Sequence, residues 1–138
     1  MPGKLAPGRP ADLQAAAATP VPKQLWTVDA SLTPGSPVSD ITELTASATA
    51  AVQAGGGTVL DSSHVIFPNG AVTLVLILAE SHLAIHTWPE ENLIAIDLFS
   101  CGSIDAGRVA AELTRLLRLD GAQIRWLARG RVAVTPQR

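Results

Sequence analysis

The segment AESHLAIHTWPEENLIAIDLFSCG, residues 79–102, determines the centre of the expected fold. It contains two strand-like runs, HLAIHTW and NLIAIDLFSC, which are separated by the polar turn PEEN. The preceding run AVTLVLILAES, residues 71–81, is almost continuously apolar, as is typical of a strand buried in the middle of a sheet. Three consecutive strands joined by hairpins form a meander, so the sequence predicts a mainly antiparallel sheet.

The sequence on either side of this meander predicts further strands. Residues 24–32 (QLWTVDASL) and 58–67 (TVLDSSHVIF) are strand-like and are followed by turn-forming residues. Residues 122–135 (AQIRWLARGRVAVT) are expected to form a last strand, or a short hairpin that turns at Arg129 and Gly130.

Two segments show the apolar spacing of an amphipathic helix. In residues 39–57, Ser39 or Asp40 is a suitable N-cap and a run of glycines ends the helix. Residues 103–121 predict a second helix that ends at Gly121. The predicted fold is therefore an α+β two-layer sandwich, in which two helices cover one face of a mainly antiparallel sheet.

Composition limits the classes of protein to consider. The chain has 138 residues and a net charge of −2, which leaves no basic field for nucleic acid. No run of about 18 uncharged apolar residues is present, so no membrane span is expected. Residues 1–22 are rich in Pro, Ala and Gly and predict a disordered leader, which leaves residues 23–138 as one domain. The single cysteine, Cys101, cannot form an internal disulfide, as expected of a protein of the reducing cytoplasm.

Residues 79–102 also concentrate reactive side chains. A serine hydroxyl needs a base or a strained neighbour before it attacks a carbonyl, and the nearest bases to Ser81 are His82 and His86. Side chains alternate along a strand, so Ser81 and His86 meet only where the strand bends or breaks. Taken alone, a neighbouring Ser-His pair or an isolated cysteine is more often structural than catalytic.

A further hypothesis for the same residues is a zinc site made of His82, His86 and Cys101. Strand positions four apart lie roughly 13 Å from each other, which is too far for one ion with bonds of about 2 Å. No metal site is therefore expected.

The run ESHLAIHTWPE, followed by IDLFSCG, resembles the signature of one family. The self-cleaving, pyruvoyl-dependent S-adenosylmethionine decarboxylases of bacteria and archaea carry E-S-H, then I-H-T-W-P-E, then D-x-F-[ST]-C-G. The resemblance covers about residues 24–131 in the order of elements, and its motifs are specific from about residue 64 to residue 102. An eleven-residue match with functional residues at fixed spacing is a strong indication.

The resemblance implies that the chain cuts itself between Glu80 and Ser81, into residues 1–80 and 81–138. In this family the serine attacks the preceding carbonyl and turns the peptide bond into an ester. Elimination and hydrolysis then leave a pyruvoyl group on the new N-terminus. His86 matches the histidine that removes the proton for elimination, and Thr73 stands where the family usually has a serine that supports processing.

The chemistry explains why these residue types are needed. Decarboxylation of an α-amino acid requires an electron sink, and no side chain provides one, so a carbonyl cofactor is required. A pyruvoyl group formed from Ser81 would bind the substrate amine as a Schiff base. Cys101 matches the family cysteine that returns a proton to the substrate carbon, and an ordinary thiol is mostly protonated at neutral pH. His82 receives no role.

The resemblance also implies which residues bind the substrate. Glu90 matches the glutamate that binds the nucleoside ribose, Trp88 belongs to the same motif, and Phe67 is near an aromatic that stacks on adenine. In HVIFPNG the aromatic is shifted by one position, which predicts that it lies on the other strand face. Other departures from the family pattern are one extra residue between Gly70 and Thr73, Glu91-Asn92 in place of Y-G, and KQLW in place of G-x-H-L.

The expected function is decarboxylation of S-adenosylmethionine, which supplies the aminopropyl donor for spermidine synthesis in polyamine biosynthesis. An alternative is the same machinery acting on ornithine or arginine, and a second alternative is an uncut binding or regulatory homologue. One sheet with helices on one face leaves sheet surface open. The family closes it by dimerising with active sites at the interface, so a homodimer of processed protomers is expected.

Overall fold

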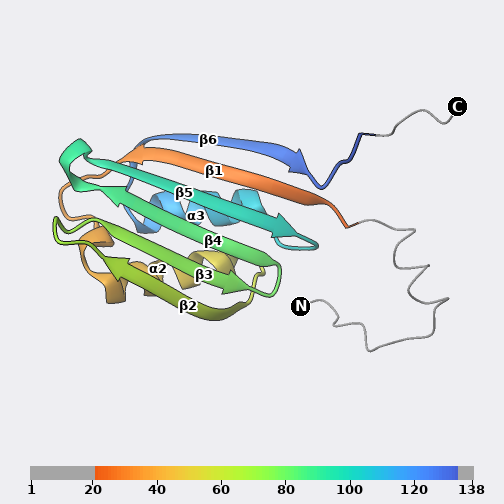
Figure 1. Cartoon of the computed structure of the whole chain (residues 1–138), viewed down its shortest axis with the longest axis horizontal. Coiled ribbons are helices and arrows are strands. Elements are labelled where there is room, and N and C mark those ends of the chain that lie inside the picture. The colour runs from red at the N-terminus through yellow and green to blue at the C-terminus, as the bar shows by residue number, and fades with distance from the viewer. Residues whose placement is uncertain (1–20, 134–138) are drawn as a thin grey trace, which may run out of the picture.

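The computed structural model describes residues 21–133 and contains one six-stranded sheet. The strand order is β2-β3-β4-β5-β1-β6, and all neighbouring strands are antiparallel (Figure 1). The strands are β1 (Lys23–Ser31), β2 (Val59–Ile66), β3 (Val72–Leu78), β4 (Ser81–Trp88), β5 (Leu93–Cys101) and β6 (Asp120–Arg129). The predicted disordered leader lies outside the described residues, except for its last two.

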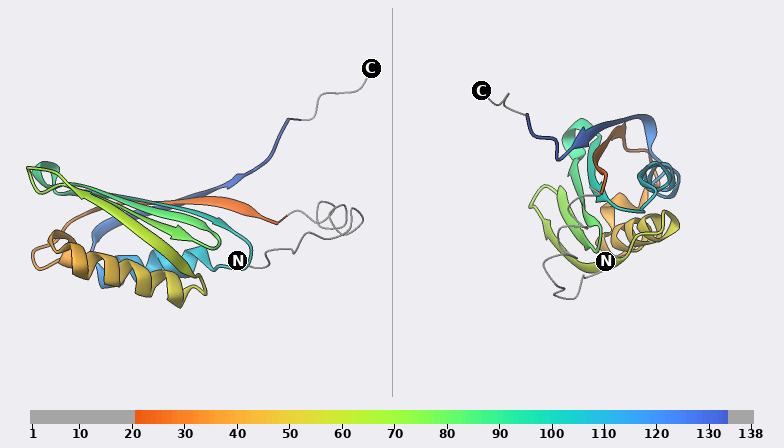
Figure 2. Two further views of the ribbon diagram at one scale, coloured as in Figure 1. Left: turned by 60° about the horizontal axis from the view of Figure 1, so that its bottom comes forward. Right: turned by 90° about the vertical axis from the view of Figure 1, so that its right-hand side faces the viewer.

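Two helices, α2 (Ile41–Ala54) and α3 (Ala106–Leu116), lie on the same face of the sheet (Figure 2). Two short 3-10 turns are also present. The first, η1 (Pro37–Ser39), precedes α2, and the second, η2 (Pro89–Glu91), joins β4 to β5. The predicted α+β two-layer sandwich is confirmed. None of the helices in the described part of the chain is long and apolar enough to cross a membrane.

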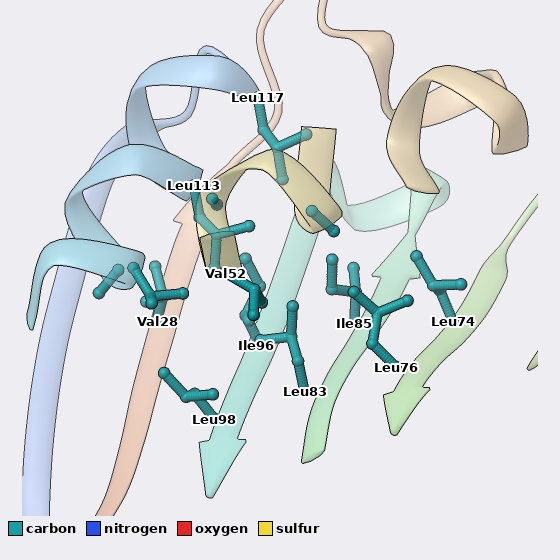
Figure 3. Packing of buried hydrophobic residues seen from close by; sticks show 14 of the residues in the cluster. Val28, Val52, Leu74, Leu76, Leu83, Ile85, Ile96, Leu98, Leu113 and Leu117 are labelled. Atoms are coloured by element: carbon teal, nitrogen blue, oxygen red, sulfur yellow. The ribbon is translucent and has the colours of Figure 1, made fainter. Parts of the chain in front are cut away.

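The core lies between the helices and the sheet, as Figure 3 shows. Alternate residues of the central strands are fully buried because the pleat directs every second side chain to the helices. Each large aliphatic side chain buried in this way contributes about 1.5–3 kcal/mol. The largest of them are Leu44, Val52, Leu74, Leu76, Leu83, Ile85, Ile94, Ile96, Val109, Leu113 and Leu117.

Helix α2 begins where its sequence predicted. Of the two N-cap candidates, Asp40 has this role, because its carboxylate accepts hydrogen bonds from the backbone N–H groups of Thr42 (2.9 Å) and Glu43 (3.3 Å). Ser39 instead ends the short η1 turn.

Helix α3 ends earlier than predicted, at Leu116 instead of near Gly121. Arg118 takes the left-handed position, with a φ of 52°, and the N–H of Leu119 donates to the carbonyl of Thr114 (3.0 Å), as in a Schellman cap. The Thr33 hydroxyl donates to the Arg118 carbonyl (2.6 Å), so a distant loop stabilises a conformation that usually needs glycine.

The last segment forms the single strand β6, and Gly121 lies inside it. No second strand follows Gly130 in residues 131–133, and the rest of the alternative hairpin lies outside the described residues. The sheet face away from the helices is covered by no described element (Figure 2).

Candidate active site

The Glu80–Ser81 peptide lies at the tip of the β3–β4 hairpin. Leu78 pairs with Ser81, so Ala79 and Glu80 form the turn, and Ser81 starts β4 instead of ending the preceding strand. Ser81 has a φ of 141°, a region that residues with side chains rarely adopt. Such a conformation costs on the order of 1–3 kcal/mol and persists only where surrounding contacts maintain it.

Two hydrogen bonds fasten this turn to the loop before β2. The N–H of Ala79 donates to the carbonyl of Thr58 (2.9 Å), and the N–H of Thr58 donates to the carboxylate of Glu80 (3.0 Å). The Glu80 side chain is buried. The acid before Ser81 therefore anchors the strained peptide, a contact that the sequence did not reveal.

The carbonyl oxygen of Glu80 accepts a hydrogen bond from the backbone N–H of Cys101 (3.0 Å). The strand register causes this contact, because Ser81 lies opposite Ser100 in the β4–β5 pair. An N–H at this distance can stabilise the negative charge that a carbonyl oxygen acquires when a nucleophile attacks its carbon. The thiol of Cys101 is free and partly exposed.

His82 is the imidazole nearest to Ser81. Its Nδ1 is 3.3 Å from the Ser81 hydroxyl oxygen, and its ring stacks on Phe99 with centroids 5.9 Å apart. The family resemblance gives His82 no role, although its position next to Ser81 in the sequence indicated this contact.

A second group of candidate residues lies at the other end of β4. Thr73 and His86 are paired across β3 and β4, and the Thr73 hydroxyl is 3.1 Å from Nδ1 of His86. The His86 and Trp88 rings are 6.2 Å apart. A cavity of about 530 Å³ opens beside them; its lining includes Phe67, Asn69, Thr73, His86, Trp88 and Glu90.

Phe67 lies in this cavity because of the pairing between β2 and β3. Val65 is opposite Thr73, so Phe67, two residues further on, is on the Thr73 and His86 side of the sheet. The one-position shift in the sequence therefore does not remove the aromatic ring from the cavity.

Asn69 is a cavity residue that the sequence indicated only as part of a turn. Its side-chain NH₂ group donates to the carboxylate of Glu90 (3.2 Å), and its side-chain oxygen Oδ1 accepts from the backbone N–H of Ala71 (3.1 Å). The β2–β3 turn thus orients a carboxylate at the cavity edge.

The two groups of residues are separated along β4. Ser81 and His86 are five residues apart in an unbroken strand with a constant register to β5, which corresponds to about 16 Å. No bend brings them together within one copy of the chain. The hairpin end contains Glu80, Ser81, His82 and Cys101, and the cavity end contains Phe67, Thr73, His86, Trp88 and Glu90.

Metal-ligating residue types occur in both groups, but their side chains are not clustered around a common point. Within residues 21–133, no three His, Cys, Asp or Glu side chains are arranged to share an ion.

Away from these two groups, on helix α3, a hydrogen bond from Arg115 lowers the pKa of the Glu112 carboxyl.

Comparison with known proteins gives consistent similarities. The sequence pattern of the S-adenosylmethionine decarboxylase family matches residues 24–130. The chain is 36% identical over 107 residues to S-adenosylmethionine decarboxylase proenzyme 2 of Bacillus cereus, which covers 77% of this chain and 83% of the relative. A Prochlorococcus marinus S-adenosylmethionine decarboxylase proenzyme is 46% identical over 68 residues, or 49% of this chain and 54% of the relative.

A solved structure is also similar. The adenosylmethionine decarboxylase of Aquifex aeolicus superimposes with a TM-score of 0.69, covering 87% of this chain and 100% of that chain. The two sequences are 23% identical over this match, so the likeness concerns the fold.

Proposed function

Since the chain belongs to the S-adenosylmethionine decarboxylase family, we propose that it cuts itself between Glu80 and Ser81 and then decarboxylates S-adenosylmethionine. The observation that carries this proposal is the strained Glu80–Ser81 peptide, whose carbonyl already accepts an N–H hydrogen bond. The product would be the aminopropyl donor for spermidine synthesis.

Cleavage begins when the Ser81 hydroxyl oxygen attacks the carbonyl carbon of Glu80. The N–H of Cys101, 3.0 Å from the carbonyl oxygen, stabilises the charge that forms there. Breaking the C–N bond leaves an ester between Glu80 and the Ser81 oxygen, and relieves the positive φ at Ser81.

A histidine then removes the proton from the α-carbon of Ser81, and the Glu80 carboxylate leaves. Hydrolysis of the remaining enamine, with loss of ammonia, converts Ser81 into a pyruvoyl group. His86 is our candidate for this base, and the nearby Thr73 hydroxyl (3.1 Å) orients its ring.

His86 of the same copy lies about 16 Å from Ser81 along β4, which is too far for this step, so we assign the task to His86 of a second copy. Two sheets pack about 10 Å apart, face to face. We place a two-fold axis midway between the two sheets, parallel to them and at right angles to the strands. Rotation about this axis reverses the strand direction, so the Ser81 end of each copy lies over the cavity end of its partner.

The open sheet face exposes apolar side chains that suit such an interface. Exposed apolar side chains on this face come from four strands: Val65, Ile77, Trp88 and Leu127. Several exposed apolar side chains on one open sheet face are consistent with a surface that another protein covers. The proposed assembly is therefore a homodimer in which each site uses both copies.

For decarboxylation, the pyruvoyl group supplies the electron sink that side chains lack. The Cys101 thiol, beside the new N-terminus, returns a proton to the substrate carbon. Phe67 and Trp88 offer aromatic faces for a nucleoside base, and the Glu90 carboxylate, oriented by Asn69, offers acceptors for ribose hydroxyls. Because plain ornithine or arginine has no ring to stack, these residues favour the nucleoside substrate.

The intact mass of the denatured protein tests the proposal. We expect two chains, residues 1–80 and 81–138, with the second starting at a pyruvoyl group. Borohydride reduction should add the mass of an amine product or substrate to this chain with S-adenosylmethionine, but not with ornithine or arginine.

The Ser81→Ala variant should remain a single chain, and Ser62→Ala, which changes an exposed serine of β2 on the helix side of the sheet, should be cut normally. Two fragments from Ser81→Ala would contradict the mechanism. A wild-type chain that stays whole would contradict the function.

A further inference from the structure

We propose that His82 is the base that takes the hydroxyl proton of Ser81 in the first step of self-cleavage. This inference rests on the proposed function, and it divides the proton transfers between two histidines. His82 acts on the O–H bond of its own chain, whereas His86 of the partner copy acts later on the C–H bond.

The first argument is distance. Nδ1 of His82 is 3.3 Å from the Ser81 oxygen, whereas His86 of the same copy is about 16 Å along the strand. In the tautomer with its proton on Nε2, His82 accepts the hydrogen bond from the Ser81 hydroxyl at Nδ1. Hydrogen bonds used in catalysis are often long in a resting structure and shorten as the reaction proceeds.

The second argument is that the ring is held in place. His82 lies directly opposite Phe99 in the β4–β5 register, and the two rings stack with an interplanar angle of 13°. The guanidinium of Arg129 lies 5.3 Å from the centre of the Phe99 ring. Residues from β5 and β6 therefore maintain the orientation of an exposed imidazole that would otherwise rotate freely.

Every proton and electron transfer of the proposed step takes place among residues of the hairpin end. His82 Nδ1 takes the proton as the Ser81 oxygen forms a bond with the carbonyl carbon of Glu80. The carbonyl electrons move to the oxygen held by the N–H of Cys101. When the carbonyl re-forms, the C–N bond breaks, and the nitrogen of Ser81 takes the proton back from His82.

The first step can be isolated in a His86→Ala background, in which cleavage should stop at the ester. Hydroxylamine cuts an ester but not a peptide bond under mild conditions, and it leaves a hydroxamate on Glu80 and an unmodified Ser81 at the new N-terminus. The rate at which these two masses appear measures ester formation, separately from elimination and decarboxylation.

In this background we expect His82→Gln to slow ester formation by about 10²-fold or more, the usual effect of removing a general base. His64→Gln, which changes an exposed histidine on β2, should have no effect. In His82→Ala, added imidazole should restore ester formation, because a free base can occupy the vacated space. A merely structural role would not give this rescue.

Equal rates with and without His82 would overturn the proposal, and so would a loss in His82→Ala that imidazole does not restore. A wild-type chain that never forms the ester or the two fragments would instead overturn the proposed function. The two failures are therefore distinguishable.

Discussion

Cys101 makes two contributions that belong to different atoms. Its backbone N–H donates to the Glu80 carbonyl at 3.0 Å, and its thiol is free and partly exposed. The first contribution depends on strand register, and the second depends on the side chain. A substitution can therefore separate cleavage from decarboxylation.

We predict that Cys101→Ala still cuts itself, because the alanine keeps the backbone donor. Its kcat for S-adenosylmethionine should fall by about 10²-fold to 10⁴-fold, as expected when a placed acid is removed. Intact mass measures cleavage, and carbon dioxide release measures turnover. An uncut Cys101→Ala chain would mean that the thiol is needed in processing as well.

At the scale of elements, helix caps determine where α2 begins and where α3 ends. Asp40 satisfies two N–H groups at the start of α2, whereas the left-handed Arg118 ends α3 with the help of the Thr33 hydroxyl. Sequence patterns identified the first cap, because an N-cap depends on adjacent residues. They did not identify the second, because its stabilising contact comes from a loop 85 positions away.

We predict that Asp40→Ala lowers the free energy of unfolding by about 0.5–2 kcal/mol, because two N–H groups lose their acceptor. Ser39→Ala is the matched control, since Ser39 has no capping hydrogen bond to α2 and should change stability much less. Urea unfolding of the Ser81→Ala chain, which stays in one piece, would compare the two variants. Equal losses would show that the cap contributes little here.

At the scale of the whole molecule, the central feature is the separation of Ser81 from His86. The hairpin end has the peptide bond whose cleavage we propose and the donor to its carbonyl, and the cavity end has the Thr73–His86 pair. Each end lacks what the other provides. The proposed dimer with exchanged ends would make two complete sites from two incomplete ones.

This arrangement predicts complementation between two inactive chains. When His86→Ala is expressed alone it should remain at the ester, and Ser81→Ala should remain uncut. When the two are expressed together with different tags, the His86→Ala chain should form its pyruvoyl group, because its partner supplies a histidine.

The masses of the separated tagged chains check this prediction. The Ser81→Ala chain should stay whole in the mixture, because it has no nucleophile. If the His86→Ala chain stops at the ester in the mixture as well, then each site is built within one copy and the proposed assembly is wrong.

The sequence alone determined the elements and the fold class. The alternation in HLAIHTW and NLIAIDLFSC predicted two strands with one buried face, because the pleat is a local property of the backbone. The sequence also contained the motif that indicated the family, and the comparisons show that the chain belongs to this family. These features depend on residues close together in the chain.

The tertiary structure decided how those residues are positioned. The β4–β5 register brings the Cys101 N–H to the Glu80 carbonyl, and the β2–β3 register brings Phe67 into the cavity. The length of an unbroken strand separates Ser81 from His86 and leaves His82 beside the hydroxyl. The contacts between strands depend on the register of the hydrogen bonds that pair them, which residue spacing along one strand does not determine.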